Sequence, residues 1–107
     1  MANKDLRDWV AGLEAAGQLQ MVTGADREEE IGAIVDIHMR DMTNPAVMFD
    51  EIPGYDKGYR VLANILTSVP RINIALDLPI DTSEVGLVDY WRKYMKDQPS
   101  IPPVEVN

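Results

Sequence analysis

His38 is the only histidine of the chain, and histidine is the side chain best suited to proton transfer or metal binding near neutral pH. It falls on or beside the apolar face of a predicted helix, with Asp36 and Asp41 close in sequence. A general base or a metal ligand is one interpretation. Because there is no second histidine and no cysteine, no Ser/His/Asp or Cys/His set can be assembled around it. We therefore predict a core or boundary histidine with one ring nitrogen hydrogen-bonded.

Acidic residues gather at two places where a divalent cation could bind. Glu28–Glu30 are consecutive on a predicted helix, so their side chains project roughly 100° apart and do not converge on one ion. Their expected role is to complement the helix dipole in the first turn. The segment DEIPGYDKG, residues 50–58, lacks the alternating ligands and closing glutamate of an EF-hand loop. Its glycines, Gly54 and Gly58, are not followed by the GK[ST] of a phosphate-binding loop.

Two arginines are expected to be held by neighbouring structure, Arg60 in a predicted strand and Arg71 at the start of a predicted helix. Either could bind a carboxylate or phosphate through two parallel hydrogen bonds, but a salt bridge to one of the 18 acids is the simpler expectation. Four aromatic residues recur at helical spacing, which favours core packing over a stacking platform: Trp9, Tyr90, Trp91 and Tyr94. The residues alone predict no catalytic, cofactor-binding or metal-binding residue in this chain.

The spacing of apolar residues predicts four helices that would position these side chains. The first spans Asp5–Ala16, with Asn3 or Asp5 as its N-cap and Gly17 just beyond its end. Its apolar face is expected to carry Leu6, Trp9, Val10 and Leu13.

The second predicted helix starts at Asp26, which would form a capping box with Glu29. It stops before Asn44-Pro45, because the residue that precedes a proline avoids helical angles. Its buried stripe is expected to be Ile31, Ile34, Val35, His38 and Met42.

The third and fourth predicted helices lie in the C-terminal half of the chain. The third has Pro70 near its first turn and ends at Leu78-Pro79, with an apolar face of Ile72, Ala75 and Leu76. Along the fourth, Val88, Trp91 and Met95 line one face, and Arg92, Lys93 and Lys96 collect near the C-terminal end. The available N-caps are Thr67 or Ser68 for the third, and Asp81 or Ser83 for the fourth.

Three short strands complete the predicted elements: Leu19–Val22, Ala46–Phe49 and Tyr59–Asn64, with a turn over residues 53–58 between the last two. The order α-β-α-β-β-α-α, with three strands and four helices, predicts a small layered domain of the α/β or α+β class.

Length and charge limit the functions that the chain can have. At 107 residues it is long enough for one domain. A net charge of −8 with scattered basic residues argues against binding nucleic acid or an anionic membrane surface. No apolar run is long enough to span a bilayer, and the charged N-terminus does not resemble a signal peptide. The absence of cysteine favours the cytoplasm.

The order and the amino-acid sequences of several segments resemble the N-terminal domain of the UbiD family of decarboxylases. DLRDWVAGLEAAGQLQMV is similar to the family's opening helix and strand, and REEEIGAIVDIHMR to its next helix. PAVMFDEIPGYDKGYRVLANIL and PRINIALDLP resemble the strand, turn, strand and helix that follow, and IPPVEVN the connector towards the catalytic part. The resemblance runs from about Asp5 to Val106 and departs from the pattern at Asp77, where glycine is common in the family.

This resemblance implies a reversible decarboxylase for aromatic or α,β-unsaturated acids that uses prenylated FMN with Mn²⁺ and often K⁺. In the family a Glu-Arg-Glu set performs the acid–base work, and that set, the flavin and the metal ligands belong to a later domain. None of its motifs matches residues of this chain, so no catalytic residue is carried over.

We therefore expect residues 1–98 to be a UbiD-like N-terminal domain and residues 99–107 a proline-rich connector towards an absent flavin-binding domain. Pro99, Pro102 and Pro103 would stiffen this tail, and Val104 and Val106 would pair with that domain or with a neighbouring copy. The expected partner is the remainder of the decarboxylase, its flavin-binding and C-terminal domains. The alternative is a separately encoded accessory subunit or binding module that docks on catalytic chains. A homo-oligomer is also compatible with the sequence.

Overall fold

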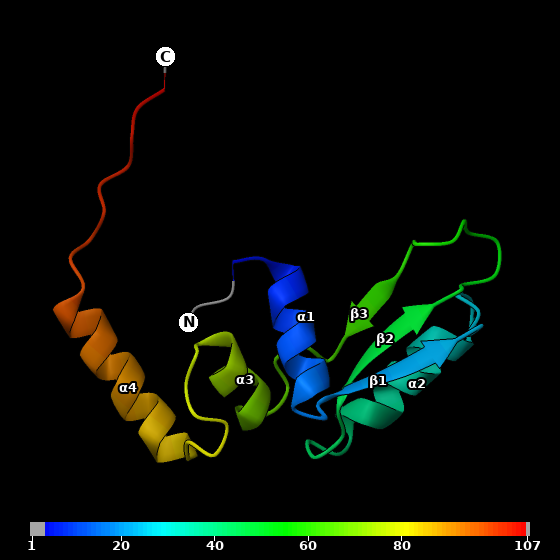
Figure 1. The fold of residues 1–107 in the computed structure, drawn as a ribbon, viewed down its shortest axis with the longest axis horizontal. Coiled ribbons are helices and arrows are strands. Elements are labelled where there is room, and N and C mark those ends of the chain that lie inside the picture. The colour runs from blue at the N-terminus through cyan, green and yellow to red at the C-terminus, as the bar shows by residue number, and fades with distance from the viewer. Residues whose placement is uncertain (1–3, 107) are drawn as a thin grey trace.

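The computed structural model describes residues 4–106, and Figure 1 shows how its helices and strands are arranged. Within that range four helices and three strands follow one another in the predicted order, so the predicted small α/β fold is confirmed. The helices are α1 (Leu6–Ala15), α2 (Glu30–Met39), α3 (Val69–Ala75) and α4 (Glu84–Asp97), and the strands are β1 (Leu19–Thr23), β2 (Ala46–Asp50) and β3 (Val61–Ala63).

The strands form one mixed sheet in the order β1-β2-β3. Strand β2 runs parallel to β1, with Leu19 opposite Ala46, and antiparallel to β3, with Met48 opposite Leu62. A parallel pair needs a crossover connection, which α2 supplies here. Because β2 is central and covered on both faces, its first four residues are all buried.

The third strand is shorter than predicted. Pairing covers only Val61–Ala63, whereas the sequence predicts a strand over Tyr59–Asn64. Asn64 has a left-handed backbone, with φ of 58°, and this conformation cannot continue a β-ladder. Tyr59 and Arg60 lie before the strand and are exposed, so the prediction of a strand position for Arg60 is wrong.

Alternate residues of β2 enter two hydrophobic clusters, one on each face of the sheet. Val47 and Phe49 belong to the cluster that α2 covers, with Val22, Ala25, Ile31, Ile34, Val35, Ile52 and Ala63. Ala46 belongs to the cluster under α1 and α3, with Trp9, Val10, Leu13, Leu19, Leu62, Ile74 and Ala75. The sheet is therefore the middle layer between α2 and the α1–α3 pair.

Helix α1 follows the prediction closely. The Asp5 carboxylate accepts hydrogen bonds from the N–H groups of Arg7 at 2.8 Å and Asp8 at 3.2 Å, and Gly17 after the helix has φ of 67°. The alternative cap, Asn3, lies outside the described residues. Leu6, expected on the apolar face with the buried Trp9 and Leu13, is exposed and lines an open hollow with Leu66 and Ala75.

Glycine at position 12 sets how closely α1 approaches α3. A β-carbon built on Gly12 would lie 3.3 Å from Cγ2 of Ile74, which is tighter than most such contacts. The close packing of the two helices therefore depends on a residue without a side chain.

The start of α2 differs from the predicted capping box. The Asp26 carboxylate accepts hydrogen bonds from the N–H groups of Glu28 and Glu29, each at 2.9 Å. The N–H of Asp26 donates to Oε2 of Glu30 at 2.9 Å, not to Glu29, because a turn over residues 27–29 delays the regular helix until Glu30. The backbone hydrogen bond from Glu29 is the main cause that lowers the pKa of Asp26.

The end of α2 corrects the predicted buried stripe. The helix stops at Met39, before Asn44-Pro45 as expected, and Ile31, Ile34 and Val35 pack on the core. Met42 lies in the turn after the helix and is exposed. In this turn the Asp41 carboxylate accepts hydrogen bonds from the Thr43 hydroxyl and N–H, which lower the pKa of Asp41.

Helix α3 ends earlier than the predicted Leu78-Pro79. Asp77 has φ of 57°, and the N–H of Leu78 donates to the carbonyl of Asn73 at 2.8 Å. This is the Schellman type of helix end, in which the left-handed position favours glycine. The position where this chain departs from the family's usual glycine is therefore a left-handed one.

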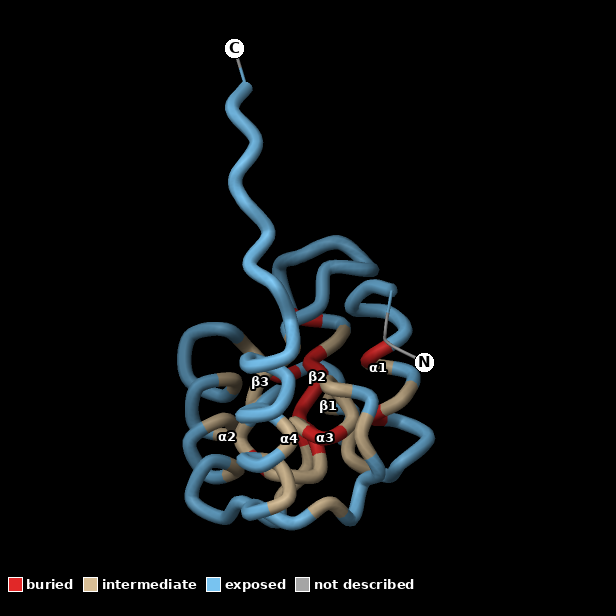
Figure 2. The backbone as a smooth tube through the Cα atoms, turned by 90° about the vertical axis from the view of Figure 1, so that its left-hand side faces the viewer, coloured by how far each residue is buried: buried red, intermediate tan, exposed pale blue. Residues whose placement is uncertain are grey.

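The molecule is flat, with extents of 47 × 44 × 22 Å and a radius of gyration of 17.0 Å. Figure 2 shows that the tail after α4 extends away from the body, and residues 99–106 have neither helix nor strand. Crossing a lipid bilayer would require a longer and more apolar helix than any within residues 4–106.

Candidate functional site

Helix α4 has the least contact with the rest of the fold. It is the longest helix of the described range, with 14 residues, yet none of its residues is buried. Its N-terminus is well formed, because the predicted cap Ser83 accepts a hydrogen bond from the N–H of Gly86 at 3.1 Å. The helix therefore has a well-formed start, but within residues 4–106 no other element buries its apolar side.

Asn73 fixes the loop that leads into α4. Its side chain is fully buried, and Nδ2 donates to the carbonyl oxygens of Ile80 at 3.2 Å and Thr82 at 2.9 Å. Asn73 is a functional residue that the sequence patterns did not indicate. The available signal was an amide on the inner face of a short helix, between Ile72 and Ile74, where asparagine is a poor helix former unless its side chain bonds to backbone.

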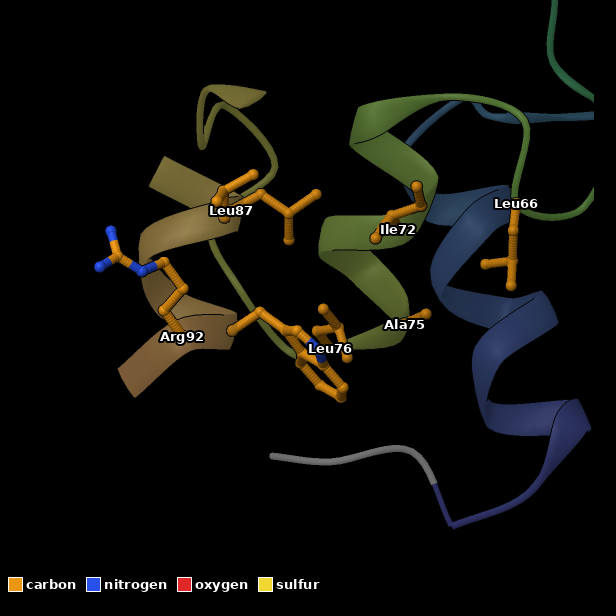
Figure 3. Close-up of a pocket in the computed structure, with 8 residues that line it drawn as sticks. Leu66, Ile72, Ala75, Leu76, Leu87 and Arg92 are labelled. Atoms are coloured by element: carbon orange, nitrogen blue, oxygen red, sulfur yellow. The ribbon is translucent and has the colours of Figure 1, made fainter. Parts of the chain in front are cut away.

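An apolar groove of about 430 Å³ separates α3 from α4 (Figure 3). Ile72 of α3 and Leu76, directly after α3, line one wall, Leu87 of α4 lines the other, and Leu66 closes the end next to α1. The polar end of Arg92 points away from α3, so the groove itself has almost no polar surface. The complete lining is Leu66, Ile72, Ala75, Leu76, Leu87, Val88, Trp91 and Arg92.

The aromatic residues of α4 are not core residues, which corrects the prediction for three of the four: Tyr90 is half-buried, and Trp91 and Tyr94 are exposed. Trp9 of α1 is buried as expected, but Trp91 and Tyr94 are 47% and 43% exposed. The rings of Trp91 and Tyr94 stack with centroids 5.4 Å apart, and Tyr90 stacks on Tyr94 at 6.1 Å. Helical spacing identified one apolar face correctly, but spacing cannot show whether the rest of the chain covers it.

Arg71 is the most deeply buried cation of the described chain, with 1% of its surface exposed. Its guanidinium donates to neutral oxygens of Gln18 at 3.2 Å, Asn44 at 2.8 Å and Thr67 at 2.6 Å, where the sequence analysis expected a carboxylate. Burial lowers the pKa of Arg71, although a guanidinium still remains charged near neutral pH. Arg71 thus joins α3 to the loops before β1 and β2 and is not available to a ligand.

The two predicted N-cap residues of α3, Thr67 and Ser68, do not cap the helix through their side chains. Ser68 occupies the N-cap position, but its buried hydroxyl forms no capping hydrogen bond. The Thr67 hydroxyl donates to the carbonyl of Asn64 at 3.2 Å and receives the Arg71 hydrogen bond. The Thr67 hydroxyl therefore acts as an acceptor for Arg71 and not as a helix cap. The predicted position of Pro70 in the first turn is confirmed.

His38 is half-buried, and both of its ring nitrogens have a partner. Nδ1 lies 3.0 Å from the carbonyl oxygen of Ile34, and Nε2 lies 3.0 Å from Oε1 of Gln20. The expected boundary position is confirmed. Both neighbouring oxygens are acceptors, and a neutral imidazole carries one N–H, so the tautomer decides which of the two contacts is a hydrogen bond. With both nitrogens facing oxygens inside the fold, the geometry supports a structural link between α2 and β1.

A smaller hollow of about 310 Å³ brings together Arg27, Tyr55 and Arg60. Nη1 of Arg27 donates to the Tyr55 hydroxyl at 2.7 Å, and Nε of Arg27 lies 3.0 Å from a carboxylate oxygen of Glu28. One of the three consecutive glutamates is thus held by a neighbouring arginine, while Glu30 bonds back to Asp26.

The residues described do not fit the cofactor set that the resemblance implies. Within residues 4–106, no three histidine or acidic side chains lie close enough together to hold a metal ion. The groove between α3 and α4 offers apolar walls, and it lacks the hydrogen-bond donors that a flavin phosphate needs. Residues 4–106 therefore do not fit a site for prenylated FMN or its metal.

The family model for the 3-octaprenyl-4-hydroxybenzoate carboxy-lyase N-terminal domain, UbiD_N, matches residues 10–89. The chain belongs to this family. The matched range runs from α1 through both hydrophobic clusters and into α4, so the family includes every element of the layered body.

Similar solved structures come from the vanillic acid decarboxylase of Sedimentibacter hydroxybenzoicus. Its open form with truncated ShVdcD matches with a TM-score of 0.84 and 29% identity, over 92% of this chain and 21% of that chain. Its open form matches with a TM-score of 0.81 and 30% identity, over 96% of this chain and 22% of that chain. Its closed form matches with a TM-score of 0.78 and 28% identity, over 100% of this chain and 22% of that chain. This UbiD_N chain therefore spans about a fifth of the length of these decarboxylase chains.

Proposed function

We propose that residues 1–98 are the N-terminal, non-catalytic domain of a UbiD-like decarboxylase, and that residues 99–107 connect it to the flavin-binding region. The observation that carries this proposal is the UbiD_N match over residues 10–89, within a chain that covers only 21–22% of similar decarboxylase chains. The substrates proposed for the complete enzyme are aromatic or α,β-unsaturated carboxylic acids.

In this proposal the domain is architectural. Prenylated FMN, Mn²⁺ and K⁺ belong to the flavin-binding region, where the cofactor supplies the decarboxylation chemistry. The described residues contribute a layered body, in which hydrogen bonds from Arg71 and Asn73 hold α3 and the loop before α4. Such a body can cover the flavin-binding region and help to define the geometry between the domains.

A direct test compares the 107-residue chain with the complete decarboxylase. The purified chain is expected to fold, to remain colourless and to leave flavin fluorescence unchanged in a titration. When the flavin-binding region is supplied, joined to the chain or co-expressed with it, both should purify as one complex with decarboxylase activity.

Two outcomes would change this conclusion. A yellow, active 107-residue chain would contradict a non-catalytic role. A complex formed only from separately encoded polypeptides, with a stop codon directly after Asn107, would support the accessory-subunit alternative. The coding sequence beyond codon 107 is the quickest observation that separates the two.

A further inference from the structure

We propose that the α3–α4 groove and the exposed apolar face of α4 are the surface on which the flavin-binding region of the decarboxylase docks. This inference rests on the proposed function and names the surface that it uses. The contacting surface of the flavin-binding region would be apolar at its centre, with carboxylates at its rim.

The apolar face of α4 has no partner within the described chain. Val88, Trp91 and Met95 recur at intervals of three and four residues and lie on one side of the helix, yet all three are exposed. A helix of 14 residues is marginally stable in water without tertiary packing of its apolar side. The structure therefore has a formed helix whose stabilising contacts must come from another surface.

The accessible surface is larger than that of a compact monomer. It amounts to 8163 Å², whereas a compact monomer of 12.0 kDa is expected to expose about 6,000 Å². The extended tail, exposed throughout residues 99–106, supplies much of this excess. Part of the remainder is the exposed apolar side of α4, on which Val88 and Met95 are 58% and 63% exposed.

In the proposed enzyme, a flavin-binding region that follows the tail would begin next to this face. The tail starts directly at the end of α4 and is fully exposed, including Ile101, Val104 and Val106 (Figure 2). A polypeptide that continues from the tail is tethered beside α4, and a linker this short gives it a high effective concentration there. Docking on α4 needs no long connection, whereas docking on α2 would require crossing the sheet.

Charge on α4 specifies the rim of the partner surface. Arg92, Lys93 and Lys96 lie on the C-terminal half of the helix together with Asp97, and Arg92 already faces Asp89 at 3.8 Å. Lys93 and Lys96 are the basic residues at the edge of the apolar face that favour carboxylates on the partner. A second copy of this chain would bring another net charge of −8, which disfavours self-association.

The test measures amide hydrogen exchange of residues 84–97 in the free chain and in the complete decarboxylase. Exchange in α4 is expected to slow by about tenfold or more in the complete enzyme, because docking removes local opening. Exchange in α2, on the opposite side of the sheet, is expected to stay within about twofold.

Matched substitutions make the test specific to the proposed surface. Val88→Asp on α4 and Ile37→Asp on α2 alter side chains with 58% and 61% exposure, so both free chains should fold. Val88→Asp should return α4 exchange in the complete enzyme to within about twofold of the free chain, whereas Ile37→Asp should not. Met95→Glu and Met39→Glu, at 63% and 58% exposure, provide a second pair with the same expected contrast.

Three other results would contradict the docking surface, the proposed function or the identity of the partner. If the complex assembles while α4 exchange and the Val88→Asp variant behave like their α2 controls, the docking surface is wrong and the proposed function stands. If the wild-type chain forms no complex, the proposed function fails, and this inference fails with it. If the free chain is a dimer with protected α4 amides, the occupant is a second copy.

Discussion

Helices α3 and α4 are neighbours in sequence, but α3 is anchored to the rest of the molecule through buried residues and α4 is not. The seven residues of α3 include the buried Arg71 and Asn73, which bond to loops on three sides. The 14 residues of α4 include none that is buried. The comparison shows that a helix's length and amphipathic pattern do not determine how firmly it is held. Polar side chains that reach backbone groups elsewhere fix α3, and α4 has no equivalent.

The largest expected contrast is between the two tryptophans, one in the body and one on α4. Trp9→Ala removes a buried ring from the α1–α3 cluster and should lower the free energy of unfolding by about 3–5 kcal/mol. Trp91→Ala in the free chain should cost less than about 1 kcal/mol, because its ring is half-exposed. Urea unfolding of both variants measures the difference. Equal losses would mean that α4 is held as firmly as the body.

Removing the Arg71 guanidinium should loosen α3 from its neighbours. Arg71→Met keeps the aliphatic stem but leaves oxygens of Gln18, Asn44 and Thr67 without their donor. The expected loss in the free energy of unfolding is about 3 kcal/mol, since hydrogen bonds from charged groups are strong and unpaired buried acceptors are costly. Arg40→Met, which removes an exposed ion pair with Asp36, is the control and should change stability by less than about 1 kcal/mol.

Asn73→Ala should loosen the loop between α3 and α4 more than it loosens the helices themselves. It removes the donors to the Ile80 and Thr82 carbonyls and should cost about 2 kcal/mol. Amide exchange in residues 79–83 should accelerate together with that loss. Thr82→Val, which removes only the hydroxyl hydrogen bond to Pro79, should have a smaller effect on both measurements. A variant with unchanged exchange in the loop would show that Asn73 does not hold α4 in place.

Acid should weaken the Asp26 cap at the start of α2, whereas the Ser83 cap of α4 has no carboxylate to protonate. The pKa of Asp26 is lowered in the folded chain, so its contribution is present above the ordinary aspartate pKa of about 4 and is lost as pH falls through the folded value. Asp26→Asn should therefore lower stability at pH 7, and the difference from wild type should shrink below about pH 4. Ser83, the cap of α4, does not titrate. Thermal melts from pH 2 to 7 measure this, with Glu105→Gln in the exposed tail as control.

The elements that the sequence predicted well are those governed by local rules. The limits of α1, β1 and β2 followed from capping residues, glycine and proline, and they agree with the structure to within a residue or two. The ends of β3 and α3 were missed because Asn64 and Asp77 adopt left-handed angles, which those residue types permit but do not require.

The candidate site was harder to predict than the fold, because it depends on what packs against what. The spacing of Val88, Trp91 and Met95 indicates an apolar face, but the same spacing describes Trp9 and Leu13, which are buried. Only the positions of α3 and the sheet decide which face is covered. The partners of Arg71 were similarly beyond sequence reasoning, since Gln18 and Asn44 come from loops far away along the chain.

The glycine at position 12 has a consequence for the chemistry around Arg71. With a β-carbon 3.3 Å from Ile74, the two helices would have to separate slightly, and α3 would carry its arginine with it. The bond from Arg71 to Gln18, already 3.2 Å long, would be the first to stretch. The missing side chain at Gly12 thus helps to set the distance over which Arg71 reaches its partners. A redesign of this domain should therefore change positions 12 and 71 together.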